Sequence, residues 1–248
     1  MKVNVSRLFW NMLIGAVLSV IIVLVNVPNI ADIAERFYRV PFSVADGLVS
    51  IRRNNLFFFL IPLTFILACF YSNRELFYDQ FVIRFQDMRV IWKIQVKELT
   101  KLSALYAFVF NAAGIITGLY YSKILCNWDQ AESLCFILSS GTVKLHPALI
   151  IAGSFLLSVL VLMIYSMLFF LLIWRLSSPI GALFLCAAVV AADLVAYATE
   201  VHVFPSGLLS NDYTCWNTGM LLRTFAAIAL IVILYWFGTK AVRKKEFL

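Results

Sequence analysis

The sequence holds few side chains that could perform covalent chemistry. It contains no G-x-x-x-x-G-K-[ST] phosphate loop, because the nearest candidate, Gly238 followed by Lys240, lacks the upstream glycine and the preceding strand. It contains no H-E-x-x-H motif, and its two histidines, His146 and His202, are far apart in the chain. We therefore expect no catalytic residue, no cofactor and no metal site in this chain.

Asp193 is a charged residue inside the apolar stretch SSPIGALFLCAAVVAADLVAYA. A carboxylate near the middle of a membrane costs several kcal/mol unless it is paired, protonated or hydrated. One interpretation is a group in a substrate pathway that favours a cationic peptide or drug. The other is a structural hydrogen bond to a neighbouring helix, or a position closer to the membrane surface. The many alanines of this stretch allow close helix packing, so we expect protein around it.

The composition points to a membrane as the solvent of this chain. Of its 248 residues, 63% are hydrophobic and 13% are charged, about half the charged fraction of an ordinary soluble domain. A soluble domain with so little polar surface would aggregate. This composition argues against a soluble enzyme, a disordered chain, a disulfide-rich mini-protein and a conventional nucleic-acid binder.

Six apolar stretches are long enough to cross a bilayer, which takes about 20 residues per helix. We expect an all-α polytopic membrane protein with one domain, residues 1–248. Pro28 should end the first helix, Pro62 should kink the second and Pro179 should begin the fifth. Gly114 and Gly118 form a G-x-x-x-G pair that allows close packing within or between subunits. The predicted spans are 9–27, 55–71, 102–121, 148–174, 179–199 and 219–237.

Six spans place both termini on one side of the membrane, and the basic residues indicate which side. The segments on the side of the termini hold 13 basic and 5 acidic residues, a formal charge of +8, and the opposite segments hold seven of each. Asp193 inside the fifth span brings the sum to the net charge of +7. The positive-inside rule then predicts that both termini are cytoplasmic. The segments on the basic side are 1–8, 73–101, 175–178 and 239–248.

Three of the five cysteines, Cys126, Cys135 and Cys215, lie in predicted external segments, where disulfides can form. A bridge between Cys126 and Cys135 would close a short loop. A bridge from either one to Cys215 would join two external segments, and a reducing habitat would leave all three as thiols. These alternatives stay open.

The predicted cytoplasmic loop between the second and third spans carries an amphipathic pattern. Large apolar residues recur at helical spacing, with basic residues mostly on other faces. Such a helix can lie on anionic lipid headgroups or dock into a groove on a soluble partner, and the two are compatible. The apolar positions are Phe77, Phe81, Phe85, Met88 and Trp92.

The order of these features resembles the permease subunits of bacterial ABC-2-type exporters, in particular the small six-span permeases near peptide-antibiotic and bacitracin resistance or immunity operons. The proline-containing second span FFFLIPLTFILACF precedes an acidic and aromatic stretch, YSNRELFYDQF, and the chain ends in the basic tail KKEFL. A pattern R-F-x-x-x-R-x-x-W-x-x-K of that family is matched in tighter spacing by Arg84, Phe85, Arg89, Trp92 and Lys93.

This resemblance implies a half-transporter in the bacterial plasma membrane. Two permease subunits, identical or paralogous, would each rest on a separate ATP-binding subunit that holds ATP and magnesium. A coupling helix at about Asp79–Lys93 would transmit the motion of that subunit, with arginines pairing with its acidic residues and aromatic residues filling its groove. Nucleic acid is not expected as a partner. The coupling residues carried over are Asp79, Phe81, Arg84, Phe85, Arg89, Trp92 and Lys93.

The substrate expected from this resemblance is an amphipathic peptide, a drug or a lipid-like molecule, moved by alternating access. A different class remains open, namely a six-span scaffold or accessory protein without a transport pathway, whose basic loop binds lipid or protein. An independent ion-coupled carrier is a third alternative. It is supported only by Asp193, because no inverted repeat with broken helices is visible.

Overall fold

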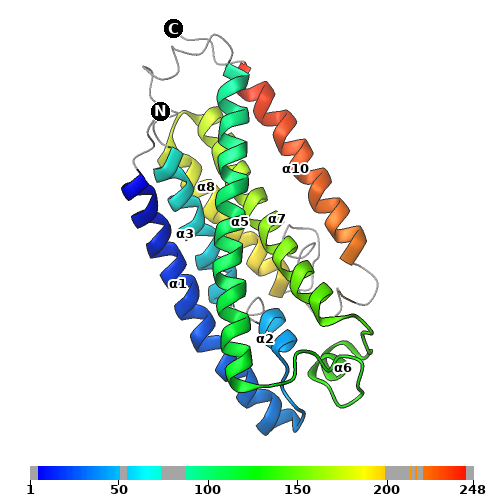
Figure 1. The fold of residues 1–248 in the computed structure, drawn as a ribbon. Coiled ribbons are helices and arrows are strands. Elements are labelled where there is room, and N and C mark those ends of the chain that lie inside the picture. Colours follow the sequence, from blue (N-terminus) through cyan, green and yellow to red (C-terminus); the bar gives the residue numbers. More distant parts are fainter. Residues whose placement is uncertain are drawn as a thin grey trace.

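The computed structural model describes residues 5–50, 55–73, 88–198, 213, 216 and 220–243. Within these residues every regular element is a helix and none is a strand, which confirms the all-α prediction for them. The long helices run side by side along one direction (Figure 1). Their bounds are α1 Val5–Asp32, η1 Ile33–Tyr38, α2 Val44–Ser50, α3 Asn55–Asn73, α5 Met88–Tyr121, α6 Leu134–Ser139, α7 Pro147–Leu176, α8 Pro179–Ala198 and α10 Met220–Arg243.

Five helical stretches in the described residues are long and apolar enough to cross a membrane. They coincide with five of the six predicted spans, and they are compatible with a multi-pass membrane protein. The remaining predicted span, the second at 55–71, coincides with α3, whose described apolar part, Leu60–Asn73, is shorter. The count of six therefore stays a prediction. The five stretches are Ala16–Tyr38, Arg89–Tyr121, Pro147–Leu176, Pro179–Ala196 and Met220–Arg243.

Pro28 does not end the first helix, so that prediction is wrong. α1 continues through Pro28 to Asp32 and passes directly into the π-helix η1, which ends at Arg39 in the left-handed region with φ 54°. A proline inside a helix costs about 3 kcal/mol because it removes one hydrogen bond and crowds a carbonyl group. α1 packs against α3 and α5, and this packing offsets the local cost. Pro179 begins α8, as expected.

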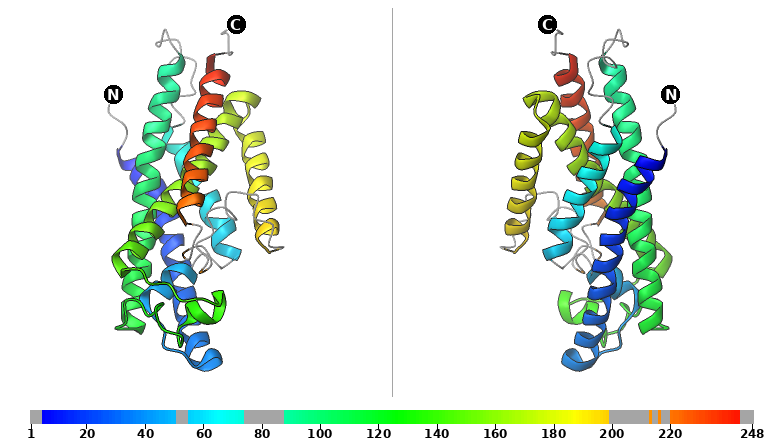
Figure 2. Two further views of the ribbon diagram at one scale, coloured as in Figure 1. Left: turned by 90° about the vertical axis from the view of Figure 1, so that its right-hand side faces the viewer. Right: turned by 90° about the vertical axis from the view of Figure 1, so that its left-hand side faces the viewer.

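α7 is the central helix of the bundle. In its apolar stretch 72% of the residues are buried, and it packs against α3, α5, α8 and α10. Apolar residues cover all its faces, which is typical of a helix surrounded by protein. α8 lies at one side of the bundle (Figure 2) and has 28% of its apolar stretch buried. The protein surroundings expected for this alanine-rich helix are thus only partly supplied by the described chain.

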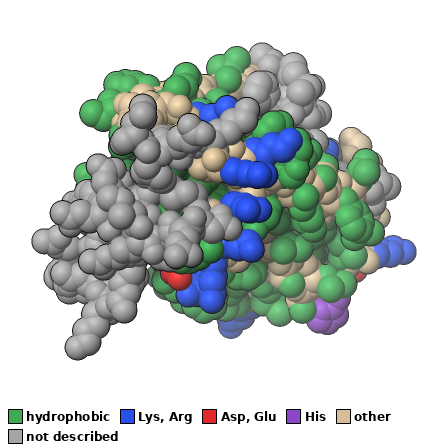
Figure 3. Space-filling view, turned by 90° about the horizontal axis from the view of Figure 1, so that it is seen from above, with side chains coloured by type: hydrophobic (Ala, Val, Ile, Leu, Met, Phe, Trp, Pro, Cys, Tyr) green, Lys and Arg blue, Asp and Glu red, His purple; other side chains and the backbone are tan. Residues whose placement is uncertain are grey.

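The two ends of the bundle differ in charge. α5 begins and α7 and α10 end at the upper end in Figure 1, which we call the basic end. Figure 3 looks onto this end and shows a line of Lys and Arg side chains across it. The opposite end carries η1, α2 and residues 122–146, and we call it the cap end. The exposed basic residues of the basic end are Arg89, Lys93, Lys97, Lys101, Arg175, Lys240 and Arg243.

Replacing Gly238 with Ala should force α5 and α10 apart, because the new Cβ would lie 2.1 Å from Cζ2 of Trp92. Overpacking of this kind costs about 1–3 kcal/mol. Each kcal/mol should lower the melting temperature of the purified protein by roughly 2–4 °C. The matched control is Gly181→Ala in α8, whose Cβ would lie at an ordinary 3.4 Å from Ser178 Oγ. Equal melting temperatures for the two variants would contradict the close packing of Trp92 on Gly238.

Candidate functional site

The basic end of α5 extends beyond the predicted third span. That span was expected at 102–121, whereas the helix begins at Met88 and runs without a break over 34 residues. A helix of this length measures about 51 Å, against about 30 Å for the hydrocarbon core of a bilayer. If residues 102–121 fill the core, the residues from Met88 to Lys101 project by roughly 20 Å.

One face of this projecting segment is positively charged. Arg89, Lys93, Lys97 and Lys101 are exposed and follow one another at intervals of four residues, which places them in a row along the helix. We call them the basic ladder. Lys101 Nζ lies 2.8 Å from the carboxylate of Glu98. Like charges at this spacing destabilise a helix by about 0.2–0.5 kcal/mol per pair, so the ladder needs compensation from packing or from an anionic partner.

The opposite face of the segment joins α5 to two other helices. The Trp92 side chain is fully buried and lies on Gly238, and its Nε1 donates to the carbonyl oxygen of Tyr235 in α10 at 3.1 Å. One turn further, Trp174 of α7 donates from Nε1 to Oε1 of the buried Gln95 at 2.9 Å. We call these contacts the tryptophan joint. A displacement of the projecting segment therefore acts directly on α7 and α10.

The structure describes three of the seven predicted coupling residues. Arg89 and Lys93 are exposed on α5, and their contact with a partner stays a prediction. Trp92 was expected to fill a groove on a partner, but its side chain is used inside the chain. The remaining four, Asp79, Phe81, Arg84 and Phe85, lie outside the described residues.

Asp193 is 1% exposed on α8, and the Tyr165 hydroxyl of α7 donates to its Oδ2. This is the kind of contact that the structural interpretation requires, since it supplies a donor to a carboxylate in an apolar helix. Nearby, Cys186 Sγ lies 3.8 Å from the Tyr165 carbonyl oxygen. The pair holds α8 against the central helix. The substrate-pathway role of Asp193 stays a prediction.

The short helix α2 of the cap end packs against α5 at Gly118, the second glycine of the pair. Gly114 and Gly118 are both buried. A Cβ on Gly118 would lie 3.1 Å from Cγ1 and 3.2 Å from Cα of Val44 in α2. Gly118 therefore brings the cap close to α5, and its described neighbour is α2.

The cap end contains a polar site that the sequence analysis missed. Asp46 is fully buried, and its Oδ2 accepts from the backbone N–H of Ser43 at 2.9 Å and from the Ser43 hydroxyl at 2.7 Å. Its Oδ1 accepts from Trp128 Nε1 at 2.8 Å. Burial raises the pKa of Asp46, while these hydrogen bonds and the Tyr213 hydroxyl act against that rise. The S-x-x-D spacing of Ser43 and Asp46 is a capping-box signal that could have revealed this Asp46 hub.

Aromatic packing surrounds the Asp46 hub. The ring centroid of Trp128 lies 5.4 Å from that of Tyr213 and 5.8 Å from that of Trp216. Asn127 Nδ2 adds a hydrogen bond to the carbonyl oxygen of Pro41 at 2.9 Å. These contacts connect α2, the residues just before it and the segment after α5 with Tyr213 and Trp216.

One of the disulfide alternatives for the external cysteines is excluded. Cys126 and Cys135 are not joined to each other, so the predicted short-loop bridge is not formed. Cys135 is buried with its Sγ 3.8 Å from Ser139 Oγ, and partial burial raises the pKa of Cys126. Cys215 lies outside the described residues. The contacts that join the described parts of the cap are hydrogen bonds and ring packing.

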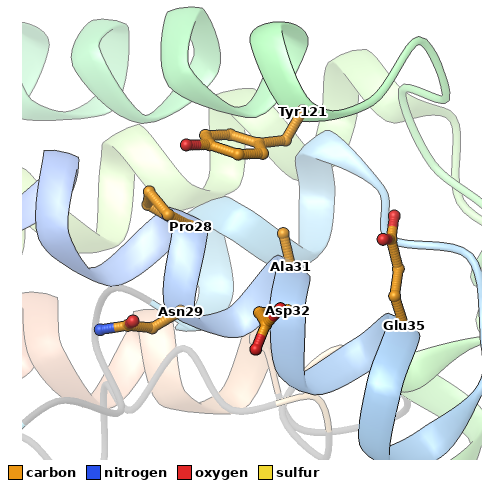
Figure 4. Close-up of a pocket in the computed structure, with 6 residues that line it drawn as sticks. All are labelled: Pro28, Asn29, Ala31, Asp32, Glu35 and Tyr121. Atoms are coloured by element: carbon orange, nitrogen blue, oxygen red, sulfur yellow. The ribbon is translucent and has the colours of Figure 1, made fainter.

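A small pocket of about 310 Å³ lies at the cap end of α5, where the predicted membrane-spanning part of this helix, 102–121, ends. Figure 4 shows Tyr121 at the end of α5 facing Pro28 and Ala31, with Asp32 and Glu35 beside them on the α1–η1 segment. Asp32 pairs with Arg36 at 2.5 Å. A tyrosine next to charged groups is typical of a membrane–water interface. About 30 Å of α5 therefore lie between Lys101 and the pocket at Tyr121. This length matches the thickness of the hydrocarbon core of a bilayer.

No protein-family model, curated protein or solved structure matches the chain. The fold itself defines the class, a helical protein with five described helices able to cross a membrane. The projecting segment and the tryptophan joint are the features of this fold that bear on function.

Replacing Trp128 with Phe should weaken the cap, because the buried Asp46 carboxylate loses a donor. Hydrogen bonds to charged groups contribute about 1.5–3 kcal/mol. Trp216→Phe is the matched control, since the indole N–H of Trp216 is buried and has no acceptor in the part of the chain that the structure describes. Hydrogen exchange of residues 122–146 should accelerate only in the first variant. Equal exchange in both variants would contradict the hub.

Tyr165→Phe and Asp193→Asn should each lower the melting temperature, and their effects should not add in the double variant. The reason is that both changes act on the same buried hydrogen bond, which Tyr165→Phe removes and Asp193→Asn weakens by neutralising the acceptor. Couplings of this kind inside a membrane average about 0.6 kcal/mol. Additive losses would show that the two side chains act separately. Impaired export by Asp193→Asn at unchanged stability would instead favour the substrate-pathway role.

Proposed function

We propose that this chain is the membrane-spanning subunit of an ABC-2-type exporter that a separate ATP-binding subunit drives. In this proposal the basic end is cytoplasmic and the cap end is external, in agreement with the positive-inside rule. The chain pairs with a second permease subunit in a bacterial plasma membrane. It moves an amphipathic peptide, a drug or a lipid-like molecule, and ATP with magnesium is bound by the partner.

The observation that carries this proposal is the continuity of α5. A soluble motor moves membrane helices only through a stiff element that contacts the motor and continues into a span. α5 supplies the stiff element of this requirement, because its 34 residues extend from Met88 to Tyr121 without interruption. The exposed Arg89 and Lys93 offer charge to an acidic surface, since complementary charges favour fast and specific docking.

The tryptophan joint supports the same proposal from inside the protein. Trp92 and Gln95 connect the projecting segment to α10 and α7 within one helical turn of the basic ladder. Contacts with a motor on one face of α5 therefore displace three helices together. This device needs no covalent chemistry in the chain.

A scaffold or accessory protein without a transport pathway is the second candidate. The observation in its favour is the contact between Tyr165 and Asp193, which engages the membrane carboxylate in helix packing. A scaffold would bind its partner in the same state with and without ATP. A transporter subunit requires coupled hydrolysis, so ATPase activity distinguishes the two candidates.

Reversing the charge of Arg89 and Lys93 to Glu should reduce co-purification of a phosphate-loop ATPase with the tagged full-length chain. Two reversed surface charges should weaken the complex by about tenfold. The melting temperature should stay unchanged because both side chains are exposed. ATP hydrolysis by the purified complex gives the second measurement.

The matched control reverses two exposed basic residues at the cap end, Lys123 and Lys144. It changes the net charge equally and should leave the complex intact. Equal amounts of ATPase with the two double variants would count against the basic ladder as the docking surface. Absence of any ATPase from the unaltered chain would favour the scaffold.

A further inference from the structure

An apolar cavity of about 520 Å³ lies between α7 and the residues that lead into α10, at the cap end of the bundle. α7 contributes Leu149, Ala152 and Leu156, and Leu145 lies two residues before this helix. Trp216 and Met220 lie opposite. Neither the basic ladder nor the tryptophan joint belongs to this cavity. Its shape and its edge indicate what it binds.

Gly153 determines the shape of the cavity. A Cβ at this position would lie 2.2 Å from Met220 Cε and 2.8 Å from the Trp216 ring. Both side chains therefore lie directly against the backbone of α7. The wall that faces α7 is formed by a rigid indole and an adaptable thioether, which suits an apolar ligand of irregular outline.

The rim of the cavity faces the lipid side of the helices. Leu149 is 58% exposed and Leu221 is 74% exposed, and both line the cavity. Leu149 and Leu156 lie two and nine residues after Pro147, the first residue of α7, or about 3 and 14 Å along the helix. This range corresponds to one leaflet of the hydrocarbon core, which is about 30 Å thick in total. An apolar cavity at this depth holds little water, because water needs polar partners, and it is open to hydrocarbon at its exposed rim.

Two polar residues flank Leu145, a lining residue of the cavity, in the sequence. Lys144 precedes Leu145 and His146 follows it, and both are exposed. His146 accepts from the Ala148 N–H through Nδ1 and caps α7, so Lys144 is the residue that can offer positive charge beside Leu145. A hydrocarbon slot that ends at a cation complements a molecule with an alkyl chain and an anionic head.

We propose that this cavity binds one acyl chain of an anionic phospholipid from the leaflet at the cap end, with the lipid phosphate at Lys144. The proposal does not depend on transport or on an ATP-binding partner, and it holds equally for a scaffold. A bound lipid would fill the wedge between α7 and α10 and stabilise the position of Trp216 beside Trp128. It would thereby connect lipid composition to the Asp46 hub.

The experiment uses the full-length chain in lipid nanodiscs with a photoactivatable phosphatidylglycerol that carries a diazirine in its acyl chain. Phosphatidylcholine with the same chain is the comparison lipid. Labelled peptides are mapped by mass spectrometry. We expect labels concentrated on residues 145–156 and 220–222, with phosphatidylglycerol exceeding phosphatidylcholine by about fivefold at the contribution of one lysine.

Two variants test the two halves of the site. Ala152→Phe fills the cavity and should remove most of the label from residues 145–156, and Leu149→Trp replaces it if Ala152→Phe folds poorly. Lys144→Glu should abolish the preference for phosphatidylglycerol. The matched controls are Ala188→Phe, at an exposed alanine of α8, and Lys123→Glu, and both should label like the unaltered chain.

Three outcomes would overturn the proposal. Labels spread evenly over the lipid-facing helices, or unchanged by both cavity-filling variants, would show that the cavity holds no particular lipid. Equal labelling by the two lipids in the unaltered chain would exclude the anionic head at Lys144. Protection of residues 145–156 from both lipids would show that a second copy of the chain covers the cavity.

Discussion

The seating of the Trp92 indole on Gly238 is the contact on which the arrangement of the basic end depends. A glycine is required there because any side chain would occupy the space of the ring. The hydrogen bond from Nε1 to the Tyr235 carbonyl fixes the orientation of the indole, since a buried indole N–H without an acceptor is costly. Together these two contacts bring the end of α10 to the start of α5. Trp174 and Gln95 add α7 to the same layer.

This layer makes the length of α5 mechanically useful. Val44 rests on Gly118 near the cap end, and 29 residues separate Gly118 from Arg89, or about 44 Å of helix. A tilt of about 5° around the cap contact would move Arg89 sideways by roughly 4 Å. In the proposed function the tryptophan joint passes that displacement to α10 and α7, and α8 is attached to α7 through Tyr165 and Asp193. The bundle thus contains three joined helices, and α8 joins them through α7.

Hydropathy predicted the bounds of α7 and α8 within a few residues because long apolar runs leave no alternative to a helix in lipid. It underestimated α5, since the polar residues before Lys101 lower hydropathy without interrupting the helix. Of the apolar stripe, Trp92 is the member whose side chain the structure describes, and it is buried. Periodicity does not reveal whether such a face is covered by the same chain or by a partner, and Gly238 lies 146 positions away. The Asp46 hub had a local signal in the spacing of Ser43 and Asp46, but its bond to Trp128 joins residues 82 positions apart and has no such signal.

Pro179, Pro28 and Asp193 show where the local sequence was sufficient to predict the structure and where it was not. Pro179 begins α8 because Ser177 in the left-handed region ends α7 through its bond to the Ile173 carbonyl, so the whole turn is encoded locally. Pro28 carries the same local signal against helix continuation, yet packing of α1 against α3 and α5 overrides it. For Asp193 the apolar stretch predicted the need for a donor. The identity of that donor, Tyr165, required the packing of α8 on α7.

The Asp46 hub also bears on how this protein matures. Its bonds to Ser43 and Trp128 need no oxidant and no thiol exchange. Trp128 lies 82 positions after Asp46, and Tyr213, whose ring packs on Trp128, lies a further 85 positions along the chain. Until these residues meet, we expect Asp46 to stay hydrated, because burying an unpaired carboxylate is costly. Closure of the cap thus comes late in the synthesis of the chain.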